Sequence, residues 1–223
     1  KNKQFFKSYG LKDFKLIHLP HAVDNDRFRK YFDQHKNSQQ EIRDKLGLSN
    51  KFNILFIGRL HQEKRIFDLI EAVGELTERI QLTIVGDGKL QSEVRLALES
   101  YPNISFKMVG FKNQKELLEF YITGDLMVLP SQLETWGLVV NEAMNFNLPI
   151  ILSDKVGCAL DLCLEKNGYV FKMGDINTLR KYIHYLVDNP KVTKKLGVES
   201  GEVIKQYSYE KIIKNLVLSL SDY

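Results

Sequence analysis

Residues 52–76 read FNILFIGRLHQEKRIFDLIEAVGEL, and this stretch decides the fold. It opens with an apolar run, which is typical of a strand that is buried on both faces of a sheet. A loop that begins with glycine follows the run. Apolar side chains then recur at helical spacing, at Ile66, Leu69, Ile70, Val73 and Leu76. The stretch therefore predicts a strand, a loop and an amphipathic helix in succession.

The same order repeats along the rest of the chain. Further short apolar runs, each expected as a strand, begin at Gln81, Ile104, Asp125, Pro149 and Gly168. Helical stretches separate most of them, and three more close the chain, from Asp175, Pro190 and Tyr209. This alternation predicts an α/β fold, a doubly wound parallel sheet of the Rossmann-like kind with right-handed crossovers. In such a sheet, ligands bind beyond the carboxyl ends of the strands.

Residues 1–50 follow a different pattern. FKLIHL, from Phe14, is expected to form a strand that ends at Pro20, and a short helix is expected around QQEIRDKLGL, closed by Gly47. We therefore expect residues 1–50 to be a linker strand and helical lead-in from an N-terminal domain, and residues 51–223 to be a Rossmann-like domain with C-terminal helices. Because the chain does not begin with Met, it is expected to be a piece of a longer protein.

The composition favours a globular protein with an anionic ligand. Hydrophobic residues make up 43% of the 223 residues, enough for a sizeable core. The net charge of +4 fits an anionic ligand or an anionic membrane surface, and the cations are spread along the chain, so nucleic acid is not expected as a partner. No stretch is long and apolar enough to span a bilayer. A cytoplasmic protein is expected, with peripheral contact at the inner membrane face as an option. Cys158 and Cys163 are expected as core residues in a reducing compartment.

Gly86-Asp87-Gly88 resembles part of a dinucleotide-binding fingerprint, but Gln91 stands where the third glycine of G-x-G-x-x-G would be. The string also follows the second strand of the series, whereas the fingerprint belongs after the first. Gly88 is therefore expected to be a structural turn glycine, and an NAD-dependent Rossmann enzyme is disfavoured. Neither a P-loop string nor a G-x-S-x-G nucleophile elbow occurs.

Two cations frame the loop after the first strand of the series. Gly58 lets a ligand approach the backbone, Arg59 follows it, and Lys64 stands five residues further on. A lysine at the start of a helix opposes the helix dipole, so it is an odd choice for structure alone. A diphosphate bound between the two cations would explain it. A solvated lysine and a surface-paired arginine explain the spacing equally well.

Residues 130–144 place two carboxylates around a Trp-Gly turn, Glu134 in the expected loop and Glu142 inside the expected helix. Both are expected to face one cleft at the end of the sheet, where carboxylates accept hydrogen bonds from sugar hydroxyls. Backbone N–H groups at residues 136–138 would meet an oxygen-rich ligand. The alternative for this string is a helix cap, with Glu142 as an ordinary solvated helix residue.

Taken together, these strings resemble the group 1 family of retaining glycosyltransferases. The match runs from about Leu19 to the C-terminus, and the Glu134–Glu142 pair followed by Ala143-Met144 is its most specific part. The other matching strings, in chain order, are His21-Ala22-Val23-Asp24, Gly58-Arg59-Leu60 with Lys64, Val85-Gly86-Asp87-Gly88, Gly110-Phe111, Pro130-Ser131, Asn167-Gly168 and Tyr207-Ser208-Tyr209.

The resemblance implies a GT-B fold, of which this chain is the C-terminal, nucleotide-sugar-binding domain. The protein's own N-terminal domain, which binds most of the acceptor, is then its expected partner. In the family, residues that match Arg59 and Lys64 hold the diphosphate, the match of Glu134 contacts the sugar ring, and the match of Glu142 contacts the ribose. By this resemblance the catalytic residues are Arg59, Lys64 and Glu134. The donor-binding residues are Gly58, Gly110, Phe111, Lys112, Thr135, Trp136, Gly137, Leu138 and Glu142.

The resemblance also implies the reaction. A hexosyl-type glycosyltransferase would move a sugar from a nucleotide sugar, such as a UDP- or GDP-sugar, to an acceptor hydroxyl with retention of configuration, in polysaccharide or glycoconjugate biosynthesis. No metal or other cofactor is expected, because the cation pair takes the metal's role. The chain by itself is expected to bind the donor without transferring sugar.

Two departures from the family pattern bear on the fine donor contacts. Phe146-Asn147 lacks the glycine that the family usually carries there, and Asp161 stands where many members carry Glu. Two other functions stay open. A non-catalytic nucleotide- or sugar-binding module is disfavoured by the intact Arg59, Lys64 and Glu134. A GT-B sugar-nucleotide epimerase would not be expected to carry the Glu134–Glu142 element.

Overall fold

A parallel sheet forms the centre of the molecule. The computed structural model describes residues 2–13, 16–17, 19–76 and 79–221. Within them, the strands are β1 (Phe52–Ile57), β2 (Ile80–Val85), β3 (Ser105–Met108), β4 (Leu126–Leu129), β5 (Ile150–Ser153) and β6 (Gly168–Phe171). All pair in parallel in the order β3-β2-β1-β4-β5-β6. The doubly wound Rossmann-like sheet that the apolar runs predict is therefore confirmed.

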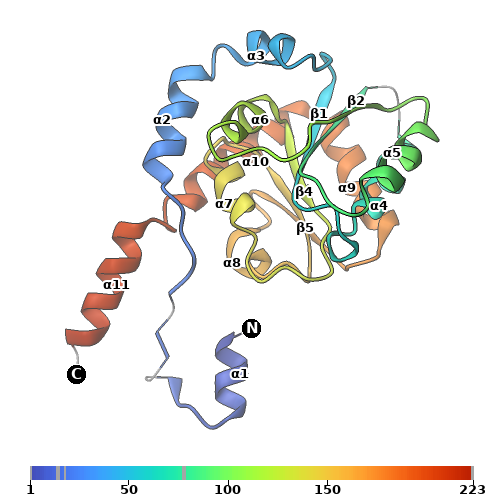
Figure 1. The fold of residues 1–223 in the computed structure, drawn as a ribbon. Helices are drawn as coiled ribbons and strands as arrows, with labels where there is room; N and C mark the ends of the chain where they lie inside the picture. Colours follow the sequence, from blue (N-terminus) through green and yellow to red (C-terminus); the bar gives the residue numbers. More distant parts are fainter. Residues whose placement is uncertain (1, 14–15, 18, 77–78, 222–223) are drawn as a thin grey trace.

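Helices cover both faces of the sheet (Figure 1). On one side α4 (Ile66–Gly74) packs with α5 (Gln91–Glu99) and α9 (Ile176–Asp188). On the other side lie α6 (Leu117–Thr123), α7 (Leu138–Met144), α8 (Ala159–Leu162) and α10 (Pro190–Ile204). Since β1 lies between β2 and β4, the chain runs outward from β1 in one direction and then returns to build the other half. The junction between β1 and β4 is the topological switch point, where ligands bind in such sheets.

The first fifty residues differ from the sequence expectation. The expected strand over residues 14–19 lies partly outside the described residues, and its described residues are in no strand. Three helices precede the sheet: α1 (Asn2–Ser8), α2 (Asn25–His35) and α3 (Gln39–Lys45). The short helix before Gly47 was expected, but α1 and α2 were not. Helix α2 is highly charged, and it is held by Asp24, whose side chain accepts from the Arg27 N–H, and by Phe28, only 2% exposed.

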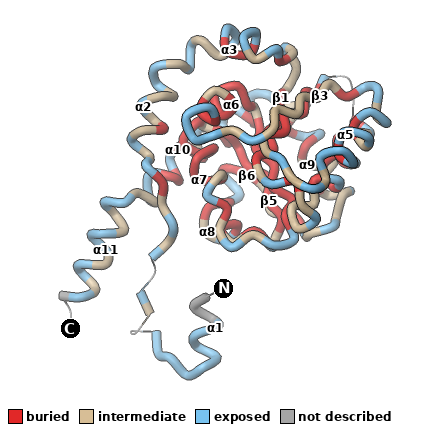
Figure 2. The backbone as a smooth tube through the Cα atoms, in the orientation of Figure 1, coloured by how far each residue is buried: buried red, intermediate tan, exposed pale blue. Residues whose placement is uncertain are grey.

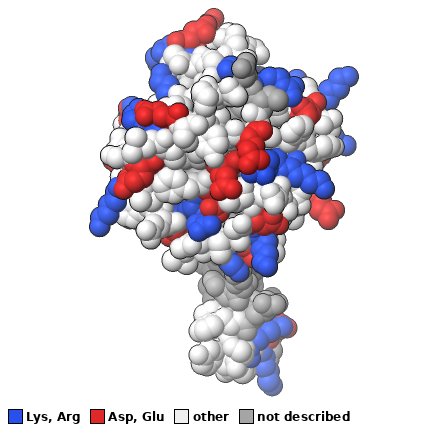
Figure 3. Space-filling model, turned by 90° about the vertical axis from the view of Figure 1, so that its right-hand side faces the viewer, with Lys and Arg blue, Asp and Glu red and all other residues white. Residues whose placement is uncertain are grey.

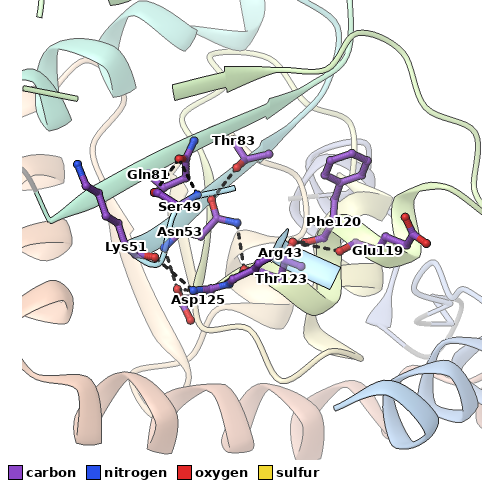
Figure 4. Close-up of polar contacts among 10 residues, drawn as sticks. All are labelled: Arg43, Ser49, Lys51, Asn53, Gln81, Thr83, Glu119, Phe120, Thr123 and Asp125. Carbon is purple, nitrogen blue, oxygen red and sulfur yellow. Dashed lines mark hydrogen bonds and ion pairs between the residues drawn. The ribbon is translucent and has the colours of Figure 1, made fainter. Parts of the chain in front are cut away.

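Arg43 of α3 fastens this lead-in to the amino ends of β1 and β4 (Figure 4). Its Nη2 donates to the Thr123 carbonyl at 2.8 Å and contacts the Asp125 carboxylate at 2.7 Å. The fully buried Asn53 donates to the same carbonyl at 3.0 Å and accepts from the Thr83 hydroxyl at 2.7 Å. Because buried polar groups are costly unless hydrogen-bonded, this network fixes α3 against the sheet at one position.

The core lies between the sheet and its two helical layers, as the burial colours of Figure 2 show. It includes Cys158 and Cys163, which are free and buried, as expected for small core residues. By contrast, α1 and α11 (Tyr209–Ser221) extend away from the sheet (Figures 1 and 2). On the face seen in Figure 3, acidic and basic side chains are interspersed. Within the described residues, no helix has the length and apolar character that crossing a membrane requires.

Candidate functional site

The loops that carry the predicted site residues meet at one edge of the sheet. All strands run in parallel, so the loops after β1, β2, β3 and β4 share the carboxyl edge. The backbone joins two of them directly, because the Gln132 N–H donates to the Glu63 carbonyl at 2.9 Å. These two residues follow β4 and β1, the strands on either side of the switch point. The predicted catalytic residues therefore lie on adjoining loops.

Lys64 and Glu134 form an ion pair and a hydrogen bond across this junction. Their side chains are only 13% and 17% exposed. The alternative of a solvated lysine is therefore wrong, because Glu134 pairs with its ammonium group. Lys64 also lies in a 3-10 turn, Gln62–Lys64, rather than at the start of α4. The structure thus brings together two of the three residues predicted to be catalytic.

Arg59 is exposed at the start of the same loop, and its guanidinium makes no hydrogen bond or ion pair with a described residue. Gly58 lies beside the Lys64 stem: a Cβ atom there would lie 3.9 Å from Lys64 Cδ. Gly58 therefore places no side chain beside the Lys64 stem. Lys64 is thus paired with Glu134, whereas Arg59 has no such partner among the described residues.

Arg65, the next residue, has a left-handed backbone with φ 51°, which non-glycine residues rarely adopt. Its guanidinium makes a two-pronged contact with Asp68 in the first turn of α4, Nε to Oδ2 at 3.0 Å and Nη2 to Oδ1 at 2.9 Å. The buried Asp68 thus supports the turn that presents Lys64. Sequence reasoning missed this contact, since an Arg–Asp spacing of three is common on ordinary helix surfaces.

Glycines bring the loop backbones into close contact. Gly86 has φ 135°, and a Cβ atom there would lie 2.0 Å from the Gly58 carbonyl oxygen. A Cβ atom at Gly88 would lie 2.4 Å from the Leu60 carbonyl oxygen, which fits its expected role as a structural glycine. At Gly157, after β5, the added atom would lie 1.8 Å from the carbonyl oxygen of Thr135. No larger residue fits these positions without moving a backbone.

The predicted Trp-Gly turn begins α7. Gly137 has φ 96° and precedes the helix, and the indole Nε1–H of Trp136 donates to Asn141 at 2.8 Å. The backbone N–H groups of Trp136 and Gly137 donate to no described residue. Thr135 and Leu138 are exposed beside them. The turn therefore presents free donors and exposed side chains at the carboxyl edge.

Glu142 does not share the surroundings of Glu134. It is 6% exposed, and its Oε2 accepts a 2.5 Å hydrogen bond from the hydroxyl of Tyr121 on α6. Burial raises the pKa of the Glu142 carboxyl, while the Tyr121 hydrogen bond and Arg27 partly oppose this rise. The reading of Glu142 as an ordinary solvated helix residue is wrong. Tyr121 was missed, because nothing in its spacing from Glu142 marks it in the sequence.

The loop after β3 holds three of the predicted donor-binding residues, Gly110, Phe111 and Lys112. Phe111 is 71% exposed, and the Gly110 carbonyl accepts a 2.8 Å hydrogen bond from the Gly86 N–H. Lys112 pairs with Glu116 at 3.4 Å. Further along, the Gln114 side chain accepts from Arg27 at 3.1 Å, which ties this loop to α2. An aromatic ring held open to solvent here is suited to stacking on a nucleobase.

A pocket of about 670 Å³ lies elsewhere, at the amino edge of the sheet. Its walls include Phe32, Arg43, Phe52, Phe146 and Lys194, and none of the predicted site residues. Arg43 is already committed to Asp125 and Thr123. We place the candidate site at the carboxyl edge, because the strand topology and the Lys64–Glu134 contact both point there.

No group of three or more His, Cys, Asp or Glu side chains in the described part of the chain is arranged to hold a metal ion. The predicted site residues provide the basic side chains of Arg59, Lys64 and Lys112, the carboxylates of Glu134 and Glu142, free backbone donors and an exposed aromatic ring. Such a set can bind an anion together with hydroxyl groups. The role of each residue stays a prediction.

Comparisons with known proteins identify the family. The family model described as "Glycosyl transferases group 1" matches residues 38–216. The chain is 26% identical over 192 residues to sulfoquinovosyl transferase SQD2 of Arabidopsis thaliana, a match that covers 84% of this chain and 36% of that protein. It is 29% identical over 193 residues to alpha-monoglucosyldiacylglycerol synthase of Acholeplasma laidlawii, covering 82% of this chain and 48% of that protein.

Among solved structures, the chain is similar to a variant of S. aureus TarM in complex with fondaparinux, alpha-GlcNAc-glycerol and UDP. The TM-score is 0.68 at 25% identity, and the match covers 76% of this chain and 35% of that chain. The chain thus spans about a third to a half of the length of these proteins. The family match includes the whole sheet and every loop of the candidate site. The chain belongs to the group 1 family of glycosyltransferases and has the Rossmann-like fold found in GT-B enzymes.

Proposed function

We propose that this chain binds the nucleotide-sugar donor of a hexosyl-type glycosyltransferase, which transfers the sugar to an acceptor hydroxyl with retention of configuration. The observation that carries the proposal is the Lys64–Glu134 contact at the switch point between β1 and β4. It places a cation suited to a phosphate beside a carboxylate suited to sugar hydroxyls. A sugar diphosphate needs both, next to each other.

The diphosphate would lie between Arg59 and Lys64. An ammonium group has three donors, so Lys64 can hold Glu134 and a phosphate oxygen at the same time. Arg59 is free to turn toward the other phosphate. At an effective dielectric constant near 20, two unit charges about 4 Å apart interact by roughly 4 kcal/mol. Two cations would therefore stabilise much of the charge that develops on the leaving diphosphate.

Glu134 would orient the sugar ring by accepting hydrogen bonds from its hydroxyls, and Glu142 would accept from the ribose. The free N–H groups at Trp136 and Gly137 would meet donor oxygens, and the exposed ring of Phe111 would lie near the base. Glu134 is not proposed as a nucleophile, because its ion pair with Lys64 suits a binding role.

The relatives support a nucleotide sugar as donor. SQD2 and alpha-monoglucosyldiacylglycerol synthase bear names of sugar-transferring enzymes, and the TarM variant was solved with UDP. A UDP- or GDP-sugar is therefore proposed as the donor class, without a metal. Peripheral contact with an anionic membrane remains a proposal that rests on the net charge of +4.

A second domain would complete the enzyme. Apolar side chains are exposed on both segments that extend from the sheet, among them Phe5, Tyr9, Tyr209, Ile213 and Leu220. Contiguous exposed apolar surface commonly marks a contact with another protein surface. We propose that an N-terminal, acceptor-binding domain of the same protein covers these side chains. The chain alone would bind the donor without transferring sugar.

Titration of the purified chain with UDP, GDP and ADP tests donor binding. At least one should bind with a dissociation constant in the micromolar to millimolar range, about 4–8 kcal/mol. Arg59→Ala and Lys64→Ala should weaken binding, whereas Lys195→Ala, on the exposed surface of α10, should not. In the complete enzyme, each site substitution should lower turnover by about two to four orders of magnitude. Binding of none of the three nucleotides would overturn the assignment, and donor binding by a complete enzyme that transfers no sugar would favour a non-catalytic module.

A further inference from the structure

Tyr121 is a buried phenol whose hydroxyl has one partner. The side chain is 0% exposed, and its hydroxyl donates to Glu142 Oε2 at 2.5 Å. The ring stacks on Phe146 with centroids 5.3 Å apart and meets Phe28 edge-on at 6.5 Å. These contacts fix the ring, and a phenylalanine ring would satisfy them equally well. Packing therefore does not account for the hydroxyl.

The hydroxyl and the carboxylate are unfavourable to bury, so their pairing calls for a function. Burial raises the pKa of Tyr121 and of Glu142 alike. A phenylalanine beside an apolar residue would fill the same space without that cost. Buried carboxylates near a binding edge are characteristic of functional sites, where a charge must be held in one orientation.

Glu142 keeps one oxygen available. Tyr121 occupies Oε2, while Oε1 accepts no hydrogen bond from a described residue and is not among the fully enclosed polar atoms that lack a partner. The remaining 6% exposure of Glu142 therefore leaves Oε1 open to a ligand. Arg27 lies near enough to favour the charged form of the carboxyl, and its guanidinium also bonds Gln114 beside the loop with Phe111. An anionic oxygen in this place is suited to accept from a neighbouring pair of hydroxyls.

We propose that Tyr121 is a positioning residue, which holds the Glu142 carboxylate so that its free oxygen meets the ribose hydroxyls of the donor. This inference rests on the proposed function and adds a residue that acts only through Glu142. Because the hydroxyl occupies Oε2, it fixes both the rotation of the carboxylate and the direction of Oε1. Without it, the carboxylate would rotate and ribose would lose its preferred acceptor.

Paired nucleotides that differ by one hydroxyl test the proposal. The purified chain and its variants are titrated with UDP and 2′-deoxy-UDP, and with GDP and 2′-deoxy-GDP. The unchanged chain should prefer the ribose form by about 10-fold or more, as expected for a hydrogen bond to a charged group. Tyr121→Phe should reduce that preference to within about threefold while the deoxy form binds as before. Glu142→Gln should reduce the preference for the ribose form to the same extent.

Tyr207→Phe is the matched control. It also removes a phenol hydroxyl, one that donates to the Asp161 carbonyl at 2.8 Å, and it should leave the ribose preference unchanged. Binding of the deoxy nucleotide by Tyr121→Phe reports that this variant is folded. An equal loss for the ribose and deoxy forms would mean a purely structural role and would overturn the inference, as would an unchanged preference. If the unchanged chain binds no nucleotide, the proposed function is wrong. If it binds nucleotides without preferring the ribose form, only the role of Tyr121 is wrong.

Discussion

Lys64 and Glu134 are ion-paired although 70 residues separate them in the chain. One follows β1 and the other follows β4, so the contact closes the switch point of the sheet. Each side chain is largely shielded from water, and a shielded charge without a partner is unfavourable. Each residue therefore keeps the other in place, in addition to any contact with a ligand.

Exchanging Lys64 and Glu134 distinguishes their effect on the free energy of unfolding from their effect on nucleotide binding. Lys64→Ala or Glu134→Ala alone should lower the free energy of unfolding by about 1–3 kcal/mol, because the remaining charge loses its partner. The double variant Lys64→Glu with Glu134→Lys restores the pair and should recover most of that loss. Nucleoside diphosphate binding should not recover, since the cation then lies on the wrong loop. Denaturant unfolding and nucleotide titration measure the two effects, and recovery of binding by the exchanged pair would contradict a fixed diphosphate position.

The Glu142 carboxyl should make stability depend on pH. Burial raises its pKa in the folded protein above the ordinary carboxyl value, so the folded state binds the proton more tightly. Its contribution to stability therefore falls as the pH rises from the ordinary carboxyl range through the raised pKa. Glu142→Gln should melt at a higher temperature than the unchanged chain at neutral pH, and this advantage should shrink on acidification. Glu99→Gln, at the exposed end of α5, should show no pH-dependent gain in melting temperature. If Glu142→Gln shows no such gain either, the prediction is contradicted.

Arg43 should contribute strongly to the stability of the lead-in. Arg43→Ala leaves the Asp125 carboxylate without its charged partner and removes one of the donors to the Thr123 carbonyl, at a cost of about 3 kcal/mol as for one partner of a buried ion pair. For a chain of this size that lowers the melting temperature by about 6–12 °C. Lys45→Ala, two residues away, breaks the Lys45–Glu119 pair, in which the lysine is 64% exposed, and should change stability by less than about 1 kcal/mol. Equal effects of the two substitutions would contradict the assignment.

At Arg65, replacement by glycine should leave the protein more stable than replacement by alanine, the reverse of the usual order in helices. Its backbone has φ 51°, where glycine is unstrained and alanine costs about 1 kcal/mol. Arg65→Gly should therefore be more stable than Arg65→Ala, although both lose the contact with Asp68. At Lys195, inside α10, alanine should instead exceed glycine by about 1 kcal/mol. The same order at both positions would show that the left-handed turn before α4 is not maintained.

The proposed enzyme should work without a metal. In the complete protein, sugar transfer should persist in excess EDTA, because Arg59 and Lys64 supply the positive charge on the diphosphate. A transfer assay with and without chelator measures this directly. Loss of activity with EDTA that manganese or magnesium restores would contradict it.

Much of the sheet was predictable from the sequence, because the residues of its central strands are buried on both faces. The run FNILFI is apolar at nearly every position because β1 is central, and its boundaries agree with the strand from Phe52 to Ile57. Helix α5 shows the limit of periodicity: Val94 and Leu98 are buried, while Leu96, which lies between them in the sequence, is 67% exposed. Helix α2 was missed, although Phe28, Tyr31 and Phe32 stand at helical spacing and pack against the core, because charged residues surround these rings in the sequence.

The sequence indicated which residues form the candidate site, but not which of these residues contact one another. Spacing placed Lys64 and Glu134 on two loops of one edge, yet only the strand order makes those loops neighbours. The pairing of Glu142 with Tyr121 depends on how α6 packs against α7, which no local pattern encodes. Long-range contacts of this kind are fixed by tertiary packing, and for that reason they escape analysis of the chain alone.

The close backbone contacts at Gly86 and Gly157 also bear on how this site can evolve. Each places a carbonyl oxygen of a neighbouring loop where a side chain would otherwise stand, so a larger residue at either position would push the two loops apart. Divergence of the proposed donor site would then proceed by exchanging side chains on an unchanged backbone. Arg59 and Phe111 are exposed and free of that constraint, so we expect a new specificity to arise by substitution at these positions.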